Sequence, residues 1–223
     1  MRSDKNTPRF LGIAFLLQAI ASLVSTFLLA PLIEPDDIIA SMTHIADSAL
    51  QVRASIVSEM FAVVGIIMLV IFLFITLKPQ NRHIAHVARG LYLLTAAIIA
   101  VSRIAAFALL QISQESVIAG HPDYLQTMGN LFYELQEFGY FLHMLPYTFG
   151  ATLFYYLFHK SGFLPRLLSL WGLIAAPLAF IGSLFDHMGL PIPMVIFLPN
   201  LPFDIAIGLW LMATEDRVFR GKP

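Results

Sequence analysis

Long runs of apolar residues alternate with short polar connections along almost the whole chain. A helix that crosses the hydrocarbon core of a membrane needs about 20 mostly apolar residues. Six segments satisfy this length: residues 10–32, 54–77, 85–111, 130–158, 167–188 and 193–213. The pattern predicts an all-α membrane protein, a polytopic helix bundle in which residues 1–223 form a single transmembrane domain of six helices.

The lysines and arginines gather on one side of these segments. Of the 13 such residues, all but Arg53 and Arg103 lie before the first segment, in or close to the connection between the second and third, between the fourth and fifth, or after the sixth. The first two connections on the other side carry acidic residues: Glu34, Asp36, Asp37, Asp47, Glu115 and Asp123. Because cytoplasmic connections are the ones enriched in Lys and Arg, we expect both termini to lie in the cytoplasm.

The first outer connection has a helical pattern of its own. Pro35, Asp36 and Asp37 are residue types that begin helices. Apolar residues then recur at helical spacing, at Ile38, Met42, Ile45 and Ala49. We expect an amphipathic helix on the outer surface, either as a cap packed on the bundle or as a lipid-sensing element.

Two prolines interrupt the last apolar segment. Pro199 and Pro202 precede Asp204, and each removes a backbone hydrogen-bond donor. The segment is therefore either a helix broken at membrane depth, as in the binding sites of transporters, or a helix that begins at Pro202 after an outer segment of residues 190–199. The sequence leaves both alternatives open.

The composition agrees with a membrane environment. Hydrophobic residues make up 58% of the chain and charged residues 12%, whereas soluble domains contain about 25% charged residues. The net charge of −1 argues against a nucleic-acid partner, which requires a basic surface. The absence of cysteine excludes disulfides and thiolate chemistry. The composition implies the lipid bilayer as a partner. It does not indicate the oligomeric state.

Ionisable residues inside the predicted helices are the candidates for a functional site, because a charge near the membrane centre costs about 2.5–3.5 kcal/mol on insertion scales. On the fourth helix, one face combines polar and aromatic side chains: Tyr133, Gln136, Glu137, Tyr140, His143, Met144 and Tyr147. The candidates for binding a substrate or an ion, mostly in the outer half of the bundle, are Glu59, Arg103, Glu137, Tyr140, His143, Asp186 and Asp204.

Carboxylates outnumber cations among these buried positions. Arg103 can pair with only one or two of them, so the others must be protonated, hydrated or compensated by a bound cation. The metal candidates are Glu59, His143, Asp186, His187 and Asp204. Their oxygen-rich donor set suits a hard cation better than zinc. The sequence specifies no cofactor, and it lacks the His-Glu-x-x-His and Gly-x-Ser-x-Gly motifs.

Two polar connections resemble those of a known family. Residues 77–82, Leu-Lys-Pro-Gln-Asn-Arg, are similar to a Leu-[Arg/Lys]-Pro-x-Asn-[Arg/Lys] turn after the second helix. Residues 158–166, Phe-His-Lys-Ser-Gly-Phe-Leu-Pro-Arg, are similar to a Phe-[Arg/Lys]-Ser-Gly-[Phe/Tyr]-[Ile/Leu]-Pro-[Arg/Lys] connection. Asp204, six residues before Trp210, resembles an acidic-then-Trp-Leu pattern in the last helix.

By these motifs the chain resembles the bacterial six-span membrane proteins catalogued as domain of unknown function 4386. The resemblance implies a six-helix bundle in the bacterial cytoplasmic membrane, with acidic residues at the positions of Glu59 and Asp186. Asp204 replaces the more usual glutamate, and His143 and His187 have no counterpart in the family pattern. The resemblance implies no activity.

Three functions remain as hypotheses, and whether the protein is an enzyme stays open. We favour small-solute or ion/proton-linked binding and transport through a polar, outward-facing site within the membrane. One alternative is an intramembrane metal-dependent hydrolase that acts on a lipid-like substrate. The other is a non-catalytic assembly or sensory module, in which the polar residues only fix helix packing.

Overall fold

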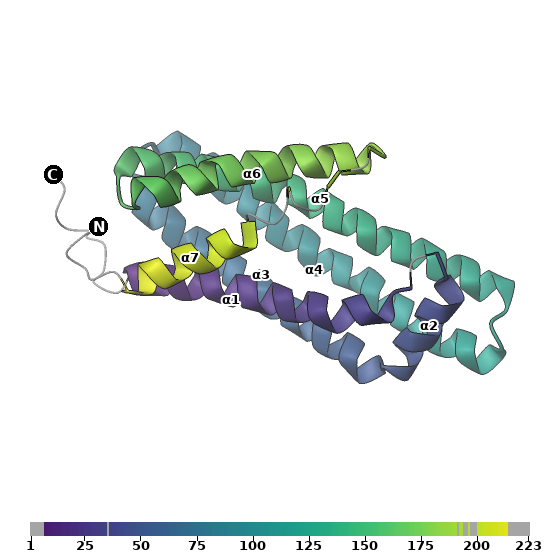
Figure 1. Ribbon diagram of the computed structural model, residues 1–223. Coiled ribbons are helices and arrows are strands. Elements are labelled where there is room, and N and C mark those ends of the chain that lie inside the picture. Colours follow the sequence, from purple (N-terminus) through teal and green to yellow (C-terminus); the bar gives the residue numbers. More distant parts are fainter. Residues whose placement is uncertain (1–6, 35, 191, 194–195, 197–199, 214–223) are drawn as a thin grey trace. The chain divides into compact units, whose positions relative to one another are not determined.

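Helices make up most of the part of the chain that its computed structural model describes, residues 7–34, 36–190, 192–193, 196 and 200–213. Within these ranges there is no β-strand, so the predicted all-α fold is confirmed (Figure 1). The helices are α1 (Thr7–Leu29), the 3-10 helix η1 (Ala30–Leu32), α2 (Ile38–Asp47), α3 (Ala49–Leu77), α4 (Arg82–Ala119), α5 (Asp123–Ser161), α6 (Arg166–His187) and α7 (Asn200–Ala213).

Four helical segments are long and apolar enough to cross a membrane: Thr7–Leu32, which joins α1 and η1, and helices α3, α4 and α6. The protein is therefore a helical membrane protein. Helix α5 has 39 residues, but its glutamates, tyrosines and threonines make it less apolar, and α7 has 14 residues. The count of six spans stays a prediction.

Several helices extend beyond the apolar segments that predicted them. Helix α4 continues to Ala119, and α5 begins at Asp123, so only residues 120–122 separate the two. His121 in this turn has a φ of 57°, and its N–H donates to the carbonyl of Ser116 at 2.8 Å. Hydropathy marks the residues suited to hydrocarbon, whereas a helix can continue into the polar region on either side.

Close contacts divide the chain into two compact units. The first unit comprises the described parts of Met1–Ala19, Val64–Ala96 and His143–Pro223. The second comprises Ile20–Val63 and Ala97–Leu142. Helices α1, α3, α4 and α5 contribute residues to both units. The single transmembrane domain over residues 1–223 stays a prediction.

Aromatic side chains form much of the core of the first unit. The rings of Tyr92 and Phe154 meet edge to face, with centroids 5.4 Å apart. Tyr155 and Phe203 meet in the same way at 4.8 Å, which holds α7 against α5. Gly172 on α6 leaves room for the Phe203 ring, because an added Cβ would lie 2.5 Å from its Cζ atom. Phe203 therefore packs between α5 and α6 and is almost fully buried.

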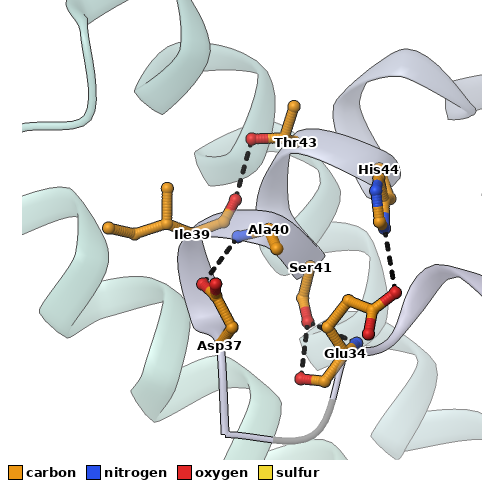
Figure 2. Close-up of polar contacts among 7 residues, drawn as sticks. All are labelled: Glu34, Asp37, Ile39, Ala40, Ser41, Thr43 and His44. Carbon is orange, nitrogen blue, oxygen red and sulfur yellow. Dashed lines mark hydrogen bonds and ion pairs between the residues drawn. The ribbon is translucent and has the colours of Figure 1, made fainter.

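In the second unit, α2 begins at a well-formed cap. The Asp37 carboxylate accepts a hydrogen bond from the backbone N–H of Ala40 at 2.9 Å (Figure 2). The Ser41 hydroxyl accepts from the Glu34 N–H at 2.9 Å and donates to the Glu34 carbonyl at 3.2 Å. Met42 packs with residues of α4 and α5, so one face of α2 is buried. That α2 lies on the outer surface of a membrane stays a prediction.

Two glycines let α1 and α7 approach closely in the first unit (Figure 1). A Cβ added at Gly12 would lie 2.7 Å from the carbonyl oxygen of Gly208. A Cβ added at Gly208 would lie 2.8 Å from Cγ of Leu16. Small residues of this kind allow membrane helices to pack backbone against backbone.

We expect Gly12→Ala to destabilise the protein by about 1–3 kcal/mol, because the new methyl group forces α7 away from α1. The matched control is Gly90→Ala on α4, where an added Cβ meets nothing within 4 Å. That control should leave the thermal midpoint unchanged or slightly raised, since alanine favours helices more than glycine does. Thermal unfolding in mild detergent measures both. Equal midpoints for the two variants would contradict the close packing of α1 on α7.

Candidate functional site

Helix α7 places Asp204 inside the first unit, just after its first turn. The helix begins at Asn200, so Pro202 lies in its first turn, where the missing proline N–H would have no helical partner anyway. A helix over these residues fits both alternatives drawn from the sequence, so the choice between a helix broken at Pro199 and Pro202 and one that begins at Pro202 stays a prediction. Pro199 and several residues before it lie outside the described residues.

Asp204 receives hydrogen bonds from two other helices. Gln18 of α1 donates from Nε2 to Oδ2 of Asp204 at 3.1 Å. The hydroxyl of Tyr147 on α5 donates to the same oxygen at 3.2 Å. The hydroxyl of Tyr155, also on α5, interacts with the carboxylate as well. The same hydroxyl interacts with the hydroxyl of Tyr92 on α4. One carboxylate and its neighbours therefore join four helices.

The hydrogen-bond partners of this carboxylate lie mostly in the protein interior. Gln18, Tyr92 and Tyr155 are all buried, and Asp204 itself is partly buried. The rings of Tyr92 and Tyr147 also contact each other, with centroids 5.4 Å apart. Burying a carboxylate without compensating hydrogen bonds costs a large amount of free energy, which these donors offset.

The donors around Asp204 are neutral. In the described part of the chain, its hydrogen-bond partners are one amide and tyrosine hydroxyls. These groups orient the carboxylate and stabilise its charge through dipoles, but they add no positive charge. The arrangement leaves a site that can take up a proton or a small cation without displacing a resident arginine or lysine.

A second polar group lies in the second unit. Arg103 of α4 interacts electrostatically with Glu59 of α3 and Glu137 of α5. The hydroxyls of Ser22 and Ser25 on α1 lie beside the Glu59 carboxylate. The Nε atom of Arg103 is buried and has no hydrogen-bond partner within the described ranges. Two carboxylates thus lie in the field of one guanidinium, which leaves an excess negative charge when all three groups are ionised.

The seven predicted site residues divide between the two units. Glu59, Arg103, Glu137 and Tyr140 belong to the second, and His143, Asp186 and Asp204 belong to the first. Tyr140 is exposed on α5, and His143 is partly buried three residues further on. Asp186 and His187 are both exposed at the C-terminal end of α6.

The described residues contain no cluster of side chains suited to hold a metal ion. No three His, Asp or Glu side chains there lie close enough together to hold a metal ion. The metal candidates of the sequence, including His143, His187 and Asp204, therefore stay a prediction. The hydrolase hypothesis that depends on them has no support from side-chain geometry.

Sequence reasoning missed most of the neighbours of Asp204. Gln18, Tyr92 and Tyr155 were not among the candidates, and Tyr147 appeared only as one residue of a polar face. Gln18 carried a usable signal, since it is a lone amide in an apolar helix and such side chains form hydrogen bonds between membrane helices. Its partner, 186 positions away in sequence, could not be inferred from spacing.

The family of the chain follows from comparison with family models. The model described as Domain of unknown function (DUF4386) matches residues 10–214 and so spans both polar groups. The chain belongs to this family. The resemblance noted in the sequence is therefore confirmed. No curated protein and no solved structure matches this DUF4386 protein, so its function must be argued from the polar groups themselves.

Proposed function

We propose that this DUF4386 protein is a six-span protein of the bacterial cytoplasmic membrane that binds and transports a small solute, linked to a proton or small cation at Asp204. One observation carries the proposal. Asp204 is a partly buried carboxylate held by Gln18 and Tyr147, and its described hydrogen-bond partners are neutral. Ionisable residues inside membrane bundles typically mark proton relays and ion pathways.

The tyrosines around Asp204 suit proton transfer. A phenol hydroxyl both donates and accepts a hydrogen bond, unlike an ammonium or guanidinium group, which only donates. Tyr155 interacts with Asp204 and with Tyr92, so exchangeable hydroxyls extend from the carboxylate toward α4. In the proposed mechanism, Asp204 holds the proton and these hydroxyls keep the carboxyl group oriented as its charge changes.

Arg103 and its two carboxylates are the second part of the proposed mechanism. We assign to Arg103 either the anchoring of an anionic group on the solute or the balancing of Glu59 and Glu137. Its buried Nε, without a hydrogen-bond partner in the described ranges, has a donor left for a ligand. The prediction that this site opens outward depends on the proposed topology.

The proposed topology is supported by the distribution of basic residues over the helices. Lys78 and Arg82 flank the connection between α3 and α4, and Lys160 and Arg166 flank the connection between α5 and α6. Under the positive-inside rule both connections and both termini are cytoplasmic. Because the natural chain has no cysteine, a single introduced cysteine reports its own side without background.

We expect a membrane-impermeant maleimide to label Asp47→Cys and Asp123→Cys in intact cells. Gln80→Cys and Lys160→Cys should react only after the membrane is permeabilised, because they lie in the proposed cytoplasmic connections. Gel-shift labelling with a large maleimide reagent measures all four variants. Labelling of Lys160→Cys in intact cells, or protection of Asp123→Cys, would contradict the proposed orientation.

We expect Asp204→Asn to abolish the transient current that a pH jump evokes in proteoliposomes on a solid-supported membrane. The asparagine keeps the shape of the side chain and one acceptor oxygen, but its amide does not take up or release a proton in this pH range. The matched control is Asp47→Asn, which removes one exposed aspartate at the end of α2 and should leave the current unchanged.

This experiment also separates the proposal from the hypothesis of a non-catalytic module. In that hypothesis the natural protein gives no more current than protein-free liposomes, and Asp204→Asn lowers only the thermal midpoint. A natural current that persists in Asp204→Asn would instead move the proton-binding group elsewhere and contradict the role of Asp204.

A further inference from the structure

The connection between α5 and α6 borders an open cavity of about 470 Å³ within the first unit. Its wall is made by the last turn of α5, the turn over residues 162–165, the first turn of α6 and Trp210 of α7. Binding cavities for small molecules typically measure about 300–1,000 Å³, so this one has the size to hold a small ligand.

The wall of this cavity carries positive charge without a balancing acid. Lys160 and Arg166 both line it, together with His159, and its described lining contains no aspartate or glutamate. The Lys160 and Arg166 side chains are exposed, so they can reach a ligand from water. The positive-inside rule alone accounts for two basic residues in this connection, but not for a cavity between them.

Local hydrogen bonds hold the wall in shape. Gly162 follows the last residue of α5 with a φ of 65°, and its N–H donates to the carbonyl of Phe158 at 3.1 Å. The Ser161 hydroxyl accepts from the N–H of Phe163 at 3.2 Å. Nδ1 of His159 and the hydroxyl of Ser169 lie 3.1 Å apart and tie the two helices together. Lys160 and Arg166 therefore lie on either side of a turn that local hydrogen bonds hold in place.

The start of α6 adds a second source of positive potential. Pro165 occupies the N-cap of this 22-residue helix and supplies no side-chain hydrogen bond to the first turn. The first N–H groups of a helix have no helical partners, and the helix dipole gives this end a partial positive charge. Arg166 is the first residue of α6 and lines the cavity. The positive end of the helix and the two cations, Lys160 and Arg166, therefore lie at the same cavity.

We propose that this cavity binds a phosphate-bearing anion, either the headgroup of an anionic phospholipid or free phosphate. Arginine forms paired hydrogen bonds with phosphate oxygens, while lysine and the uncapped N–H groups complete an oxyanion site. Basic pockets between membrane helices on the cytoplasmic side bind acidic lipid headgroups, and tryptophan is enriched at the membrane interface. The proposal is independent of any role for Asp204.

Trp210 provides a reporter inside the cavity. The chain has two tryptophans, Trp171 and Trp210, so Trp171→Phe leaves a single indole that lines the site. This variant, purified whole in mild detergent, is titrated with short-chain phosphatidylglycerol, short-chain phosphatidylcholine or inorganic phosphate. A saturable change in Trp210 emission with phosphatidylglycerol alone indicates a lipid headgroup. A saturable change with inorganic phosphate indicates that a free anion suffices.

We expect Lys160→Gln combined with Arg166→Gln to weaken this binding about tenfold or more. Each cation near an anionic headgroup contributes to the free energy of binding, and the double variant removes both. The control pair is Lys78→Gln with Arg82→Gln, which removes the same charges from the other basic connection and should leave the affinity unchanged. The proposal is wrong if neither phosphatidylglycerol nor phosphate gives a saturable response, or if phosphatidylcholine binds equally well. It is also wrong if the cavity variant binds as tightly as its parent or is weakened no more than the control pair.

Discussion

A carboxylate within an apolar helix must obtain hydrogen-bond donors from elsewhere, and Asp204 obtains them from other helices of the first unit. Gln18 brings α1 and Tyr147 brings α5 to the same carboxylate oxygen. The position of α7 depends on these bonds, because separating the helices would leave a buried carboxylate without partners. The close approach at Gly12 and the burial of Phe203 stabilise the same arrangement through packing.

The two polar groups of the protein differ in what compensates the charge of their carboxylates. Neutral donors surround Asp204, whereas Glu59 and Glu137 share the guanidinium of Arg103. The first arrangement suits the uptake of a proton or small cation, since the described partners supply no positive charge. The second leaves Arg103 with a buried Nε donor that no described residue accepts.

The sequence predicted the helical fold because the length and apolarity of a spanning helix are local properties. It predicted Asp204 and Arg103 as candidates because a charge inside such a segment is costly. It could not predict Gln18 or Tyr155 as neighbours of Asp204, since a neutral polar side chain is tolerated in many places and its partner depends on helix packing. The cavity beside Lys160 was missed for a similar reason, because the basic residues were explained fully by topology.

Infrared difference spectroscopy of the reconstituted protein between acidic and alkaline pH tests most directly whether Asp204 takes up a proton. We expect a carbonyl band of a protonated carboxyl group that is absent in Asp204→Asn and unchanged in Asp47→Asn. In Tyr147→Phe the band should move in frequency, because the phenol that donates to this carboxyl oxygen is lost. The same set of bands in the natural protein and in Asp204→Asn would contradict the proposed role of Asp204.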